Sequence, residues 1–288
     1  MSSNGTPNRT TRSPAAVRDR RRQRSTQGDI QDPLHRTHRQ YRQWVDEDYL
    51  HIKQIRSLTK TKVQRPACGS ERTADSVTAV DVMDMIADER RRVADLIAAL
   101  SPEQLATPSL CGDWTVKQVA GHLVASIAAP RRLLLPLILR SGFNVHRANA
   151  RLARLVARRS VDDLAAALRD NAQNAFRPPI VGYPGQLTDL QVHGQDIRRP
   201  LGLPHQLRPE RLRMSLNFLI GSRAVGFVPR GRRVGLRFEA TDLDWAWGGG
   251  PVVQGTAEAV MLALAGRPVV LAELHGDGVK VFRDRLMH

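Results

Sequence analysis

Asp189 and His193 are the two residues whose types and spacing point most directly to chemistry. On a helix, positions four apart lie on one face, so this carboxylate and imidazole can bind the same ion. His122, far upstream in a stretch composed for a core, is a third candidate ligand. If the two helices are neighbours, two imidazoles and one carboxylate converge and leave coordination positions open, which is typical of a catalytic metal site. A surface ion pair and a locally satisfied core histidine are the alternative interpretation of these residues.

Helical periodicity predicts the elements that would position these side chains. Thr115 is a good N-cap, and Gln118 three residues later completes the pattern of a capping box at the start of the helix that carries His122. A loop is expected at 177–185, before the helix that carries the other two candidates. The expected helical regions lie at about residues 80–100, 115–139 with a disturbance at Pro130, 145–157 with a continuation after Ser160, 186–199 and 209–219.

After Gly221 the pattern changes to short alternating segments that predict a small sheet. Strands are expected at 234–240, 245–247 and 251–254, followed by a helix at 256–264 that Thr256 caps. The predicted fold class is therefore α+β. We expect an up-and-down four-helix bundle at 77–222 and a small α+β domain at 223–288, with a disordered tail at 1–76 before them.

The positive charge of the chain is concentrated near its start. The sequence has 44 Lys and Arg against 28 Asp and Glu, a net charge of +16, and residues 1–75 supply half of that excess. This tail shows no sustained apolar periodicity, so we expect disorder. Its Arg18–Arg24 run could hold nucleic-acid phosphates, but solvated tails of this kind commonly bind nothing specific, and nucleic acid is not the expected partner. The tail is alternatively an over-extended start, because Met83 could itself initiate.

The sequence does not predict a membrane protein. No apolar core follows the charged N-terminus, and the longest apolar run, 133–139, is far shorter than the roughly 20 residues that cross a bilayer. We therefore expect a cytoplasmic chain without a membrane partner. The two cysteines, Cys68 and Cys111, form no disulfide framework, which fits a reducing compartment.

Three segments together resemble the mycothiol-dependent maleylpyruvate isomerase family. L-C-G-D-W-T-V-K-Q-V-A-G-H-L, from Leu110 to Leu123, is similar to the family signature of W-T-V followed by H-L. T-D-L-Q-V-H-G-Q-D-I, from Thr188, is similar to its second signature, and the segment from Leu236 to Pro268 is similar to the small C-terminal domain of many members. The resemblance covers about residues 79–288 and implies a DinB-like four-helix bundle.

The resemblance also implies a ligand set and a cofactor. His122, Asp189 and His193 match the family's ligands for a divalent ion, usually zinc, although the family acid is often Glu, whose side chain is longer. Gln195 stands where many members have Trp, and Asp196 could orient a ligand imidazole or pair with Arg198 or Arg199. The cofactor thiol is mycothiol, which a bound metal deprotonates for attack on a small electrophilic substrate.

The family resemblance leaves the activity open. Mycothiol could add to a double bond and leave again, which makes the protein an isomerase, or stay attached, which makes it a thiol transferase. A non-catalytic metal-binding scaffold or regulator is the alternative. Cys111, just before a helix, is either reactive or a small core residue. Arg198, Arg199 and Arg267 either meet a substrate carboxylate or are solvated charges.

Overall fold

The computed structural model describes residues 79–128, 136, 139–204 and 207–287. This part of the chain is mostly helical with one small sheet, so the expected α+β class is confirmed. The predicted tail at 1–76, including its Arg18–Arg24 run, lies outside the described residues. So does most of the predicted continuation of the second helix from Pro130 to Leu139.

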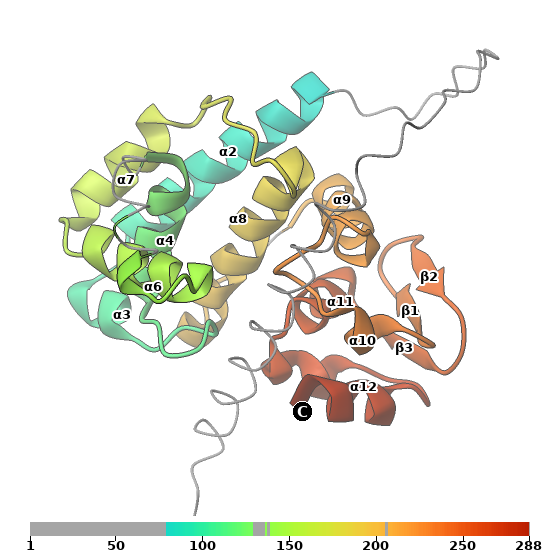
Figure 1. The fold of residues 1–288 in the computed structure, drawn as a ribbon. Coiled ribbons are helices and arrows are strands. Elements are labelled where there is room, and N and C mark those ends of the chain that lie inside the picture. Colours follow the sequence, from blue (N-terminus) through green and yellow to red (C-terminus); the bar gives the residue numbers. More distant parts are fainter. Residues whose placement is uncertain (1–78, 129–135, 137–138, 205–206, 288) are drawn as a thin grey trace, which may run out of the picture. The chain divides into compact units, whose positions relative to one another are not determined.

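Among the described residues, six helices with defined bounds form the first part of the fold (Figure 1). Their bounds are α2 (Ala79–Ala98), α3 (Pro102–Ala106), α4 (Val116–Ala128), α6 (Val145–Val156), α7 (Val161–Asp170) and α8 (Gly182–Arg198). Helices α2 and α4 each contact both α7 and α8, and α6 packs against α4. The short helix α3 was not predicted from the sequence. Ser101 follows the first helix, as expected, but it also caps α3.

The helix ends follow the predicted caps. Thr115 Oγ1 accepts from the Gln118 backbone N–H at 3.3 Å while Gln118 Oε1 accepts from the Thr115 N–H at 3.2 Å, so the capping box before α4 is confirmed. Ser160 likewise caps α7. Helix α8 begins at Gly182, four residues before the expected start. Pro184 is tolerated there because the backbone N–H that proline lacks is not needed in the first turn.

The remaining elements surround a three-stranded sheet. Strand β1 (Arg237–Ala240) lies between β2 (Ala246–Gly248), which is antiparallel to it, and β3 (Val252–Gly255), which is parallel. The three predicted strands are therefore present: β1 is three residues shorter than expected, and β2 and β3 are each shifted by one residue. The 3-10 helix η3 (Arg199–Leu201) directly follows α8. The other elements of this part are α9 (Pro209–Ile220), α10 (Arg230–Arg233), α11 (Ala257–Leu264), the 3-10 helix η4 (Pro268–Glu273) and α12 (Val279–Met287).

The buried apolar side chains form two clusters, and α8 contributes to both. Leu187, Leu190 and Ile197 of α8 pack in the first cluster with α2, α4 and α7. Val192, on another face of α8, packs in the second cluster with α9, α11 and the sheet. Because both faces are covered, most polar side chains of α8 are buried as well. None of the described helices combines the length and the hydrophobicity needed to cross a lipid bilayer.

Candidate metal centre

Helix α4 presents His122 to α8 from a closely packed position. The preceding residue, Gly121, lies so close to α6 that a Cβ there would be 2.5 Å from the backbone oxygen of Ala153. His122 is 8% exposed, and its ring centroid lies 5.3 Å from that of Trp114, in the loop before α4. The glycine therefore allows the close approach of two helices, and the tryptophan covers the imidazole.

The structure brings the three predicted ligands together. His122 Nε2 lies 3.4 Å from Asp189 Oδ2, and His193 Nε2 lies 3.4 Å from Asp189 Oδ1. One potential ligand atom from each residue lies within 4.8 Å of the other two. The shorter Asp side chain thus reaches a position between both imidazoles. Two atoms that each bind a tetrahedral ion at about 2.1 Å are separated by about 3.4 Å, so these spacings fit a shared cation.

Asp196 holds the other nitrogen of His193. His193 Nδ1 lies 2.8 Å from Asp196 Oδ2. An imidazole that donates Nδ1–H to a carboxylate keeps the lone pair of Nε2 free for a metal. Asp196 is fully buried and pairs with Arg267, whose Nε and Nη2 lie 3.0 and 2.6 Å from its two oxygens. Arg267 lies in the segment between α11 and η4, outside the helical part of the fold.

These contacts shift the pKa values of the acids and of His193. Burial by itself raises the pKa of Asp189, but His122 and His193 outweigh burial and hold this pKa well below its usual range. Burial by itself lowers the pKa of His193, but Asp189 and Asp196 raise this pKa well above its usual value. Burial by itself also raises the pKa of Asp196, but Arg267 and His193 outweigh burial. The pKa of Asp196 therefore lies below its usual value. Without a metal, the His193 imidazole is therefore protonated and lies between the ionised carboxylates of Asp189 and Asp196.

One polar atom of the site has no partner. His122 Nδ1 is buried and makes no hydrogen bond, so this imidazole, unlike His193, is not held by a second carboxylate. Two imidazoles and one carboxylate, with open coordination positions, are the donor set of catalytic zinc sites and also of non-haem iron(II) sites. The residues present therefore fit a divalent transition-metal ion.

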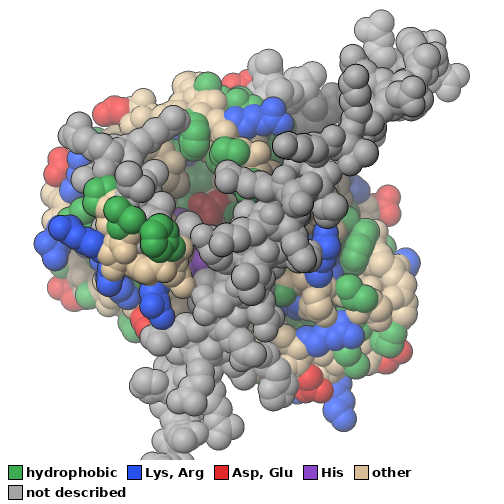
Figure 2. Space-filling view, viewed as in Figure 1, with side chains coloured by type: hydrophobic (Ala, Val, Ile, Leu, Met, Phe, Trp, Pro, Cys, Tyr) green, Lys and Arg blue, Asp and Glu red, His purple; other side chains and the backbone are tan. Residues whose placement is uncertain are grey.

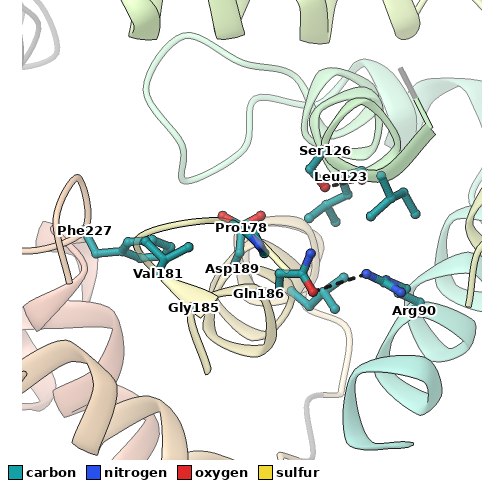
Figure 3. A pocket seen from close by; sticks show the side chains of 11 residues that line it. Arg90, Leu123, Ser126, Pro178, Val181, Gly185, Gln186, Asp189 and Phe227 are labelled. Atoms are coloured by element: carbon teal, nitrogen blue, oxygen red, sulfur yellow. Dashed lines mark hydrogen bonds between the residues drawn. The ribbon is translucent and has the colours of Figure 1, made fainter. Parts of the chain in front are cut away.

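A pocket of about 200 Å³ opens beside Asp189. Leu123, Leu190 and Phe227 are among its apolar lining residues, and Arg90 of α2 and Gln186 are among its polar ones (Figure 3). Arg90 is 1% exposed, and its Nη1 donates to the backbone oxygen of Ala172 at 2.8 Å and to two further carbonyls of the segment after α7.

The second guanidinium nitrogen of Arg90 is less well satisfied. Among the described residues its Nη2 reaches only Gln186 Oε1, at 3.5 Å, and no carboxylate there forms an ion pair with Arg90. Burial lowers the pKa of Arg90 to about 10, so it stays a cation at neutral pH. The pocket therefore has a positively charged side chain in its wall.

The sequence did not predict that Arg267 and Trp114 support the site, and it indicated the wrong arginine partners for Asp196. Asp196 pairs with Arg267, and neither Arg198 nor Arg199 is its partner. Arg199 instead binds Glu258 and Glu273, so it is not a solvated charge. Trp114 stands within the recognised W-T-V motif, but its contact with both imidazole rings could not be foreseen.

Cys111 lies at the edge of the site. It is half-buried, packs against the first cluster and interacts with His193, which agrees in part with the predicted small core residue, whereas its reactivity stays a prediction. The loop that carries it is joined to α8, because the Leu110 N–H donates to the Asp196 carbonyl oxygen.

The helical part of the fold thus holds a two-histidine, one-carboxylate cluster beside a pocket, which is a candidate metal-binding site. The family model of the mycothiol maleylpyruvate isomerase N-terminal domain matches residues 86–198, from α2 to the end of α8. This match supports the predicted family over residues 86–198, and the matched domain is DinB-like. No curated protein and no solved structure was found to match the chain.

Proposed function

We propose that this protein is a metal-dependent enzyme that uses mycothiol, a low-molecular-weight thiol, to modify a small electrophilic substrate. His122, Asp189 and His193 would hold the metal, which we take to be zinc. The observation that carries the proposal is the convergence of these three side chains, from two helices, at the edge of a pocket. The match to the mycothiol maleylpyruvate isomerase N-terminal domain supports the choice of thiol.

A bound divalent cation supplies one kind of chemistry here, the deprotonation of a thiol at neutral pH. The residues of the chain then determine what that thiolate meets. Asp196 keeps the proton of His193 on Nδ1, and Trp114 covers both imidazoles and limits their contact with water. The cationic side chain of Arg90 favours an electrophile with a negatively charged group, since no carboxylate of the described residues forms an ion pair with it.

The same site fits either of two reactions. Addition of the thiolate to an activated double bond, followed by its elimination, isomerises the bond, whereas displacement of a leaving group transfers the thiol to the substrate. We propose that the protein works in the cytoplasm on a small molecule. We also propose that α2, α4, α7 and α8 form an up-and-down four-helix bundle around the site, which their mutual contacts support.

Metal content tests the first part of the proposal. We expect elemental analysis of the full chain to find about one divalent ion per chain, and to name it. The variants H122A and H193A should lose the ion while remaining folded by circular dichroism. The matched control is H275A, because His275 is exposed and lies outside the site. A metal-free wild type, or equal metal content in all the variants, contradicts the proposal.

Thiol binding separates the enzyme from the scaffold. An enzyme should bind mycothiol in calorimetric titrations of the metal-loaded protein and lose this binding after chelation. It should then consume maleylpyruvate, as an isomerase, or couple mycothiol to an electrophile with a leaving group, as a transferase. A metal-loaded protein that binds no mycothiol is instead the non-catalytic scaffold or regulator.

A further inference from the structure

Residues 114–161 carry positive charge without a single acid. Between Asp113 and Asp162 the sequence has eight Arg and one Lys and no Asp or Glu. This stretch lies outside the basic tail, and part of it is described by the structure, chiefly as α4 and α6. The described arginines of this stretch, from Arg140 to Arg159, are exposed on the folded part of the chain.

Helix α6 concentrates this charge on one face. Arg147, Arg151, Arg154 and Arg158 follow one another three or four positions apart, so they line one side of the helix and its C-terminal end, and we call them the α6 basic face. All four are exposed, whereas Ala148, Leu152 and Ala153 on the other faces are buried. Among the described residues no acid forms an ion pair with any of the four. Nothing in this part of the protein neutralises the basic face.

Exposed apolar side chains adjoin the basic face. Leu139 is 53%, Phe143 60% and Leu155 43% exposed. Leu155 follows Arg154 on α6, and Arg151 joins the segment before the helix by donating to the Arg140 carbonyl oxygen and to Ser141 Oγ. Figure 2 shows basic and hydrophobic side chains next to one another over α6.

The backbone at Phe143 is unusual. Phe143 has a φ of +61°, the only positive φ of a non-glycine residue among those described. A bulky residue in this conformation is disfavoured, and such strain persists where the rest of the structure enforces it. The turn thus keeps a large aromatic side chain exposed to solvent just before the N-terminal end of α6, although burying it would be favourable.

We propose that the α6 basic face, together with Leu139, Phe143 and Leu155, binds the surface of an anionic phospholipid bilayer. Arginines would contact lipid phosphates while the three apolar side chains enter the interfacial region, as in amphipathic helices that lie in a membrane plane. Nucleic acid would satisfy the arginines but would leave the exposed leucines and phenylalanine without a favourable environment. Surface binding needs no spanning segment, so it is compatible with the absence of one from the described helices. It does replace the expectation that the protein has no membrane partner.

Vesicle sedimentation with the full chain tests this proposal. The probes are vesicles of phosphatidylcholine alone and vesicles with about 30% phosphatidylglycerol, at low and high salt. We expect binding only to the anionic vesicles, weakened by salt. Each basic side chain near an anionic surface strengthens binding about fivefold, so R154Q/R158Q should bind about 25-fold more weakly. R223Q/R283Q loses the same charge from exposed arginines elsewhere and is the matched control.

A second variant tests the apolar part of the surface. F143N replaces the aromatic ring by a residue that tolerates a positive φ, so the fold should be kept, and we expect about tenfold weaker binding to the anionic vesicles. Duplex DNA is the competing probe. The proposal is overturned if R154Q/R158Q binds the vesicles as tightly as the wild type, if the control variant weakens binding equally, or if DNA binds through these arginines and the vesicles do not. These measurements involve neither metal nor mycothiol, so they are independent of the proposed function.

Discussion

Two glycines, each next to a proposed ligand histidine, allow a controlled test of how closely the site is packed. Gly121 precedes His122 in α4, and Gly194 follows His193 in α8. A Cβ at Gly121 would lie 2.5 Å from the Ala153 carbonyl oxygen and 2.8 Å from Ala157 Cβ and N. These atoms belong to α6 and the residue that ends it, so they cannot move without the helix.

The magnitude follows from two opposing effects. Replacing a helical glycine by alanine stabilises a helix by about 1 kcal/mol, and this gain is common to G121A and G194A. At Gly194 the nearest atom to the added Cβ is Arg198 Nη1, at 2.8 Å, the end of a flexible side chain that can turn away. At Gly121 the backbone must shift, and overpacking of this kind costs about 1–3 kcal/mol. Because the helix term cancels, G121A should be about 2 kcal/mol less stable than G194A.

Urea unfolding of both full-length variants, followed by circular dichroism, measures this difference. Metal affinity should also fall more in G121A, because a shift of α4 displaces His122 from Asp189, now 3.4 Å away. If G121A proves as stable as G194A, α4 and α6 do not approach as described, and the argument for how His122 is positioned fails.

Two further predictions concern the acids around His193. Replacing Arg267 by Met leaves the buried Asp196 without its cation and should lower the free energy of unfolding by about 3 kcal/mol. Adding D196N should restore part of this loss in the same urea experiment. A double variant less stable than the single one would refute the pairing of Arg267 with Asp196. The raised pKa of His193 predicts that metal binding releases a proton, so the apparent metal affinity should rise up to about tenfold per pH unit below that pKa. In the metal-free protein the same proton stabilises the fold below the usual His pKa of 6.5, and the stability is lost as pH rises through the raised value. Competition titrations and urea unfolding across about pH 6 to 8 measure both trends, and a flat response in either would contradict the assigned role of His193.

Local features of the structure were predictable from the sequence because they depend on neighbouring residues. The capping box of Thr115 and Gln118 satisfies backbone groups within one turn, so its pattern specifies where α4 begins. The spacing of Asp189 and His193 places them on one face of any helix. The family was recognisable for the same reason, since its signatures lie in short continuous segments.

Only tertiary structure decided which distant residues meet. His122 reaches Asp189 because α4 packs beside α8, and a helical pattern does not specify its neighbour. Arg267 and Asp196, 71 positions apart, pair because the C-terminal segment covers one face of α8. Arg90 carries no motif, and its place in the pocket wall depends on the packing of α2 against α7 and α8. Contacts of this kind form when whole helix faces are buried. The free energy of that burial is the sum of many weak contributions from residues far apart in the chain.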